Sequence, residues 1–82
     1  MDQENALSID LDAETSMGMY CNRTIVAHSG SDFVVDFLFQ PPHADRARVR
    51  ARIILSPLIA KQLLVDLDGA TAGFEKLHGV IG

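Results

Sequence analysis

The chain has 82 residues, of which 48% are apolar and 22% are charged, and its formal net charge is -4. This length allows one small domain, whose core is modest unless a second chain adds buried surface. The single cysteine, Cys21, excludes an intramolecular disulfide framework and indicates a reduced compartment. No apolar run reaches the roughly 18 residues of a membrane span, and the acidic N-terminus does not have the pattern of a signal peptide. We therefore expect a cytoplasmic protein without a membrane partner.

Charge is unevenly distributed along the chain. Residues 1–22 hold five acids and no Lys or Arg, whereas the remaining sixty residues hold seven bases and six acids. This composition predicts a disordered acidic arm over residues 1–5 and a single α+β domain over residues 6–82. The first element of that domain is 7–12, where apolar and polar residues alternate as in a half-buried strand. An acidic strand at this place would be able to lie beside a basic one.

Two further strands are predicted over 19–28 and 33–40. The first is rich in β-forming residues, and the second alternates between two faces. One face carries Phe33, Val35, Phe37 and Phe39, and the other carries Val34, Asp36 and Leu38. The aromatic face is expected to be core, with Asp36 on the outer face. The turn-forming residues 29–32 join the two strands, which predicts a hairpin.

A fourth strand is predicted over 46–55, after two prolines that interrupt the ladder at 41–42. Its first half is RARVRAR, which places four arginines at alternate positions: Arg46, Arg48, Arg50 and Arg52. Alternate residues of a strand share one face, so the arginines are expected to form a row of about 20 Å. Asp36 is expected to pair with Arg48 or Arg50 if the two strands are neighbours.

A long helix is predicted to begin directly after the fourth strand. Ser56 is a favourable N-cap and Pro57 a favourable first helical residue. Apolar residues then recur every three or four positions, as a helix packed on a sheet requires: Ile59, Leu63, Leu67, Ala70, Phe74 and Leu77. A weaker row at Leu58, Val65 and Ala72 is spaced by sevens and indicates either a wide core face or a dimer seam.

Two glycines interrupt the helical pattern. Gly69 and Gly73 each disfavour a helix by about 1 kcal/mol relative to Ala. They indicate either a close approach of another backbone or a kinked, frayed helix, and in water the second is favoured.

The order of elements is ββββα, a four-stranded antiparallel sheet with one C-terminal helix packed on one face. Four short motifs stand within it: Y-x-N at Tyr20 and Asn22, H-S at His28 and Ser29, F-V-x-D-F at 33–37 and R-I-I-L-S-P at 52–57. In these motifs the chain resembles DUF3467, a family of small prokaryotic proteins of unknown function. The resemblance implies a self-associating, strand-rich domain without established enzyme activity. It also implies a transcription-linked alternative, because some members are encoded near RNA polymerase subunit genes.

Catalytic and metal-binding motifs are not found. His28, His43 and His78 do not have the short spacings of zinc ligands, and Cys21 is the only thiol. Cys21 is expected to be a buried structural thiol, because His28 lies too far along the same strand to activate it. The sequence has no glycine-rich phosphate loop. We therefore predict no enzyme activity, no metal site and no cofactor.

The arginine row is the most distinctive surface feature. Together with Asp36 it is predicted to be an interaction face, for which three interpretations stay open: a solvated or internally paired face, a surface for an acidic protein partner, or a grip on nucleic-acid phosphates. The pI near 5.1 disfavours a dedicated nucleic-acid binder. The sequence predicts a small homodimeric interaction module, and its alternative is a nucleic-acid-binding or RNA-polymerase-associated accessory factor.

Overall fold

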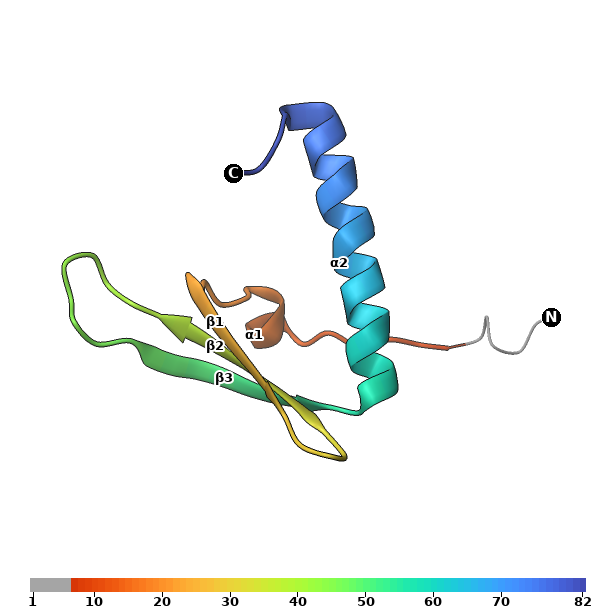
Figure 1. Ribbon diagram of the computed structural model, residues 1–82, viewed down its shortest axis with the longest axis horizontal. Helices are drawn as coiled ribbons and strands as arrows, with labels where there is room; N and C mark the ends of the chain where they lie inside the picture. The colour runs from red at the N-terminus through yellow and green to blue at the C-terminus, as the bar shows by residue number, and fades with distance from the viewer. Residues whose placement is uncertain (1–6) are drawn as a thin grey trace.

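Three strands form one antiparallel sheet, and a long helix follows it. The computed structural model describes residues 7–82 of the chain. It contains, in order, α1 Ala13–Ser16, β1 Arg23–His28, β2 Phe33–Phe39, β3 Arg48–Leu55 and α2 Pro57–His78, with the strands in the order β1-β2-β3 (Figure 1). The fold is therefore α+β, as predicted, and the C-terminal helix begins at the predicted residue.

The predicted strand over 7–12 is wrong, and no fourth strand is present among residues 7–82. Leu7, Ile9 and Leu11 are exposed on an irregular segment. A strand needs a neighbour for its backbone hydrogen bonds as well as alternation. Asp12 instead accepts a hydrogen bond from the backbone N–H of Thr15 (3.1 Å) and caps α1. The predicted arm over residues 1–5 lies outside the described residues.

The β1–β2 hairpin is confirmed, with its first strand shorter than predicted. β1 begins at Arg23 and pairs with β2 from Arg23 opposite Leu38 to His28 opposite Phe33. Residues 19–22 carry no strand before it, and Gly18 has a positive φ of 73°. The turn is held by the Ser29 N–H, which donates to the Asp32 carbonyl at 2.9 Å. Ser29 Oγ also accepts from the N–H groups of Ser31 and Asp32.

The two faces of the sheet are buried to different extents. We call Phe33, Val35, Phe37 and Phe39 of β2 the aromatic face. These four side chains were expected to be core, but they are only half-buried. The only buried residues among 7–82 are Asp36 and Leu38, on the opposite face of the same strand. Both lie on the central strand, where side chains of β1 and β3 flank them.

The sequence signals at the start of α2 are confirmed. The Ser56 side chain accepts a hydrogen bond from the Ile59 N–H at 3.2 Å, and Pro57 is the first helical residue. α2 runs for 22 residues without a break. The expected disruption at Gly69 and Gly73 is therefore wrong, because a glycine lowers helix stability without removing any backbone hydrogen bond.

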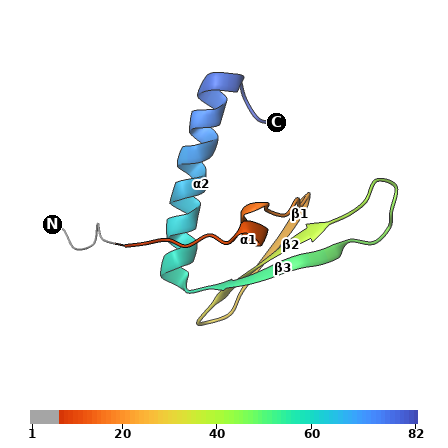
Figure 2. The same ribbon diagram turned by 180° about the vertical axis from the view of Figure 1, so that it is seen from behind.

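α2 does not cover the sheet as predicted. It begins at the end of β3 and then rises away from the sheet, so its C-terminal half lies far from the strands in both views (Figures 1 and 2). No residue of α2 is buried. The radius of gyration is 16.2 Å, whereas a compact chain of this length has about 12 Å. The single chain therefore lacks a shared core between helix and sheet.

Replacing either helix glycine with alanine should stabilise the protein. A Cβ added at Gly69 or Gly73 meets no atom within 4 Å, so Gly69→Ala and Gly73→Ala should each raise the free energy of unfolding by about 0.5–1 kcal/mol. Urea unfolding at one fixed protein concentration measures the change. Ala72→Gly is the matched control and should lower it by a similar amount. A destabilising Gly73→Ala would mean that another surface approaches the helix there.

Candidate interaction surface

A bidentate ion pair lies at the centre of the sheet. Asp36 is directly opposite Arg52 in the β2–β3 register. Arg52 donates from Nε to Asp36 Oδ1 at 2.7 Å and from Nη2 to Oδ2 at 2.9 Å. The Asp36 side chain is 11% exposed, whereas the Arg52 side chain is 63% exposed. The pairing of Asp36 with Arg48 or Arg50 that the sequence predicted is therefore wrong.

The pair sets the ionisation of both groups. The hydrogen bonds from Arg52 lower the pKa of Asp36 below its ordinary value, and the arginine's charge adds to them, although burial of the carboxylate acts in the opposite direction. The same hydrogen bonds and the charge of Asp36 raise the pKa of Arg52. Asp36 is therefore an anion at neutral pH, and its charge is already matched within the sheet.

A β-bulge in β3 divides the predicted arginine row. Phe37 lies opposite Ala51, but the next residue, Leu38, lies opposite Val49. Arg50 is therefore the extra residue of β3, and the alternation of faces changes there. Arg52 shares a face with Asp36, whereas Arg48 lies opposite Phe39 on the aromatic face. The expectation that all four arginines share one face is wrong.

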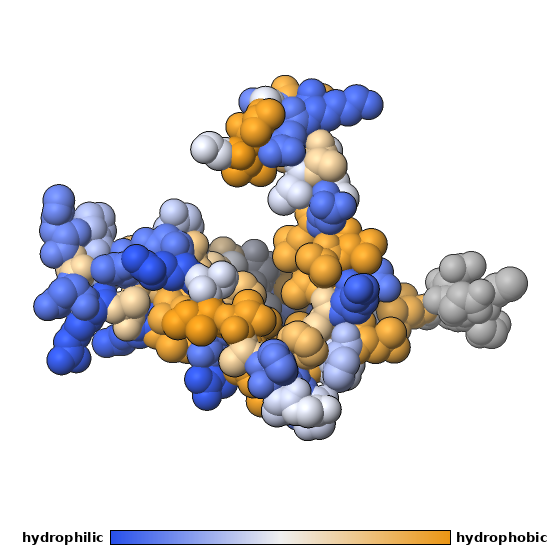
Figure 3. Space-filling model, viewed as in Figure 1, coloured by the Kyte–Doolittle hydropathy of each residue, from blue (hydrophilic) through white to orange (hydrophobic). Residues whose placement is uncertain are grey.

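Three of the arginines gather at the end of the sheet away from α2. Arg46 precedes β3 in the β2–β3 loop, and Arg48 and Arg50 begin the strand. We call these three residues the arginine end. None of them forms an ion pair with another of residues 7–82. In Figure 3, hydrophilic side chains gather at this end of the molecule.

Hydrogen bonds of Gln40 join β1 and the β2–β3 loop beside the arginine end. Gln40 exchanges two hydrogen bonds with the Asn22 side chain, both 2.9 Å, which extends the β1–β2 ladder beyond its last strand pair. Its own amide donates from Nε2 to the Ala44 carbonyl at 2.7 Å across the loop. Its Oε1 accepts from Arg23 Nε at 2.6 Å. Asn22 belongs to the Y-x-N motif, whereas no sequence pattern marks Gln40, since only the folded loop brings Gln40 and its partners together.

An aromatic pair lies beside the arginine end. Tyr20 and Phe39 meet edge to face with their ring centroids 6.0 Å apart. Arg48 lies opposite Phe39 in the sheet, and Arg50 Nη1 lies 3.5 Å from the Tyr20 carbonyl oxygen. This end of the molecule thus combines cationic side chains with exposed ring surface.

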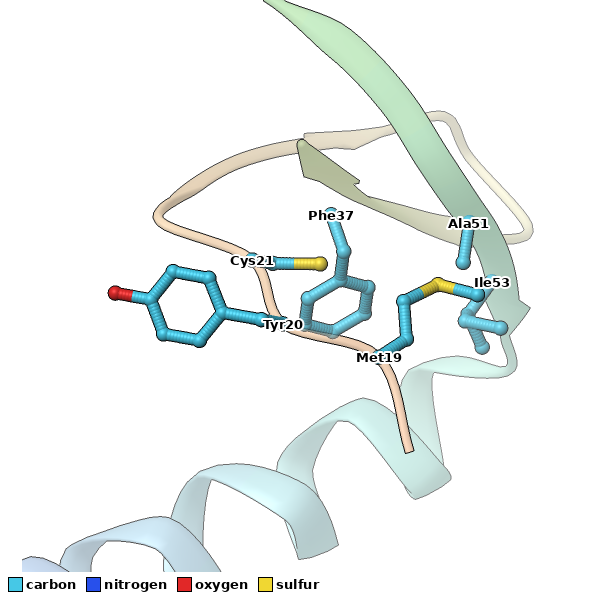
Figure 4. A pocket seen from close by; sticks show the side chains of 6 residues that line it. All are labelled: Met19, Tyr20, Cys21, Phe37, Ala51 and Ile53. Atoms are coloured by element: carbon cyan, nitrogen blue, oxygen red, sulfur yellow. The ribbon is translucent and has the colours of Figure 1, made fainter. Parts of the chain in front are cut away.

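A second surface is apolar and open. The chain exposes 7353 Å², whereas a folded monomer of its mass exposes about 4800 Å². Hydrophobic side chains cover the lower half of α2 and the sheet beside it (Figure 3). Met19, Cys21, Phe37 and Ile53 line an open pocket on the aromatic face (Figure 4). Cys21 is half-buried there and not buried as predicted.

The helix carries apolar residues on two opposite sides. We call Ile59, Leu63, Leu67, Ala70, Phe74 and Leu77 the helix stripe. At about 100° per residue, Val65 lies roughly 200° around the helix from Leu63. The row Leu58, Val65 and Ala72 therefore faces the other way, and all three of its residues are exposed. Lys61, Asp68 and Lys76 stand on the same side as that row.

The three histidines lie in different parts of the fold. The His28 ring lies tilted against Phe33 and the His78 ring lies tilted against Phe74, with ring centroids 5.7 and 4.8 Å apart. His43 lies in the β2–β3 loop with a positive φ of 66°. Among residues 7–82 no group of three His, Cys, Asp or Glu side chains is placed to hold a metal ion. Within the same residues, no helix has the length and apolarity to cross a membrane.

Comparison with known proteins identifies one family. A family model described as "Protein of unknown function (DUF3467)" matches residues 1–82, the whole chain. This match confirms the resemblance drawn from the sequence motifs. No curated protein and no solved structure matches the chain.

The Asp36–Arg52 pair should make stability dependent on acid. An unfolded Asp has a pKa of about 3.9, and the folded-state pKa of Asp36 is lower. The stabilisation by the ion pair is thus complete above the pKa of the unfolded state and is lost as the pH falls through the folded-state pKa. Asp36→Asn should lower stability at pH 7 and flatten the loss between pH 5 and pH 3, measured by urea unfolding. Asp68→Asn, at an exposed position, is the control. Parallel losses in wild type and Asp36→Asn would contradict this role.

Proposed function

Because the chain belongs to the DUF3467 family of proteins of unknown function, we propose its function from its own geometry: a non-enzymatic homodimeric interaction module. Two copies pair through their open apolar surfaces. The arginine end then recognises an acidic protein partner. The apolar surface that the single chain leaves exposed is the observation that carries this proposal.

The large exposed area of the chain supports pairing. Counting polar and apolar atoms together, the chain exposes roughly 2500 Å² more than a folded monomer of its mass. Permanent homodimers bury about 1000–2500 Å² on each subunit. A single sheet layer and an uncovered helix also give too little core for a stable domain, so a second copy would supply the missing layer.

The charge distribution supports a protein partner for the arginine end. Asp36 neutralises Arg52, but Arg46, Arg48 and Arg50 have no acidic partner among residues 7–82. Guanidinium groups bind carboxylates in bidentate geometry. The formal net charge of -4 repels a polyanion at long range, so a partner with a limited acidic patch fits better than a nucleic acid.

One observation favours a second candidate function. The Tyr20–Phe39 pair beside Arg48 and Arg50 supplies the ring surface that single-strand binders combine with cationic grooves. The alternative is therefore a nucleic-acid-binding or RNA-polymerase-associated accessory factor. Its binding would fall steeply with salt concentration, because phosphate contacts release counterions.

The homodimer predicts a particle mass in solution. Light scattering at micromolar concentration should give about twice the chain mass of 8.9 kDa. Unfolding should also become more difficult as protein concentration rises, because dissociation accompanies unfolding in a dimer without a stable monomer. A mass near that of one chain, with unfolding independent of concentration, would exclude the homodimer.

The arginine end predicts a charge-specific partner. In a pull-down from cell lysate, Arg48→Glu/Arg50→Glu should lose a nuclease-resistant protein that the wild type retains. Lys61→Glu/Lys76→Glu makes the same change in net charge on α2 and should retain it. Both variants are first shown to fold by circular dichroism. Loss of the partner after nuclease treatment of the wild-type sample would favour the nucleic-acid alternative, and equal recovery with all three proteins would refute a recognition role.

A further inference from the structure

The sheet and the helix of one chain each offer an apolar surface that the other does not cover. An open groove of ≈ 360 Å³ lies between the first turns of α2 and the aromatic face. Nine of its ten lining residues are apolar, among them Val26, Val35, Leu63 and Leu67. Beyond the groove, the helix stripe continues into solvent, where Phe74 is 51% and Leu77 is 80% exposed.

The connection between β3 and α2 keeps these two surfaces apart. Only Ser56 separates the last residue of β3 from Pro57, the first residue of α2. Ser56 is extended (φ -67°, ψ 158°) and caps the helix, while the proline ring fixes the next φ. The helix could fold down along its own sheet only if the backbone angles at this corner changed. The C-terminal half of α2 is therefore held away from the aromatic face of its own chain.

We propose that the two copies of the homodimer exchange helices, so that the C-terminal half of α2 from one copy lies on the aromatic face of the other. This inference rests on the proposed homodimer and specifies its interface. The occupant of the groove is thus the part of the helix stripe formed by Ala70, Phe74 and Leu77 of a second copy. A two-fold axis relates the two contacts, so that both aromatic faces and both helix stripes are covered in the same dimer.

The lengths of the two elements agree with this arrangement. The second half of α2, 68–78, is about 16 Å long at 1.5 Å per residue. The seven residues of β2 span about 24 Å at 3.4 Å per residue. The half-helix can therefore lie wholly over the strand and its neighbours. An apolar helix stripe packed across an apolar sheet face is also the usual way in which the two elements form layers.

Chemistry selects this side of the helix over the opposite one. The helix stripe contains no charged residue, whereas Lys61, Asp68 and Lys76 stand among Leu58, Val65 and Ala72 on the other side. Burying the second side would remove these charges from water at a cost that the short apolar row cannot offset. A dimer that pairs helix to helix through Leu58, Val65 and Ala72 is the competing arrangement, and these charges disfavour it.

Disulfide trapping between two differently tagged copies tests the exchange. Cys21→Ser removes the only native thiol, after which Val26→Cys is placed on one copy and Thr71→Cys on the other. Val26 lines the groove, and Thr71 lines an apolar hollow with Ala70 and Phe74. The copies are refolded together and oxidised, and because each carries one thiol, a mixed 26–71 link joins different copies. We expect this link to form several-fold more than a control link between Val26→Cys and Ala72→Cys, on the far side of the helix.

The outcomes separate this inference from the homodimer itself. A dimeric mass with the 26–71 link supports helix exchange. A dimeric mass with an Ala72→Cys homodisulfide and no 26–71 link would overturn it in favour of the helix-to-helix seam, and a dimeric mass with neither link would overturn it as well. A monomeric mass would exclude the homodimer. As a second measurement, Phe74→Glu should weaken the dimer at least tenfold while Ala72→Glu should not, and equal effects would contradict the exchange.

Discussion

The corner between β3 and α2 determines the shape of the whole chain. One residue, Ser56, connects strand to helix, and its side chain caps the helix while Pro57 fixes the backbone direction that follows. Because the corner is short and its geometry is held by a hydrogen bond and a ring, the helix has little freedom to reorient. It therefore rises from the sheet and leaves both its stripe and the aromatic face open. The large exposed area, the absence of a shared core and the case for a second copy all depend on this one constraint.

The sheet is organised around Asp36 and Arg52. Their bidentate pairing matches a nearly buried carboxylate with an arginine whose outer part stays in water, so no uncompensated charge remains on the central strand. The neighbouring bulge then inserts Arg50 and changes the alternation of β3. Together they divide four evenly spaced arginines into one structural residue and a group of three at the end of the sheet. Beside that end, the Asn22–Gln40 hydrogen bonds join β1 to β2.

These two features place the two proposed surfaces in different parts of the molecule. The arginine end lies at the opposite end of the sheet from α2, so a dimer formed through helices leaves it accessible (Figure 1). A chain that pairs through apolar area and recognises partners through charge needs this separation. In the proposed dimer, the hydrophobic effect, which tolerates salt, would hold the interface, while recognition would depend on screened electrostatics.

The sequence by itself determined three local features. The alternation of apolar and polar residues predicted β2, the turn residues predicted the β1–β2 hairpin, and Ser56 with Pro57 predicted where α2 begins. Each of these features depends on residues close in the chain. Three features were decided only by tertiary structure. Residues 7–12 alternate like a strand but have no strand beside them. The arginines lie on different faces because β3 contains a bulge, and a bulge depends on how two strands pair. The direction of α2 depends on the backbone angles at one corner. A periodic pattern predicts which residues share a face of a strand or helix. Pairing and packing with distant segments decide whether that strand or helix forms and what lies against its face.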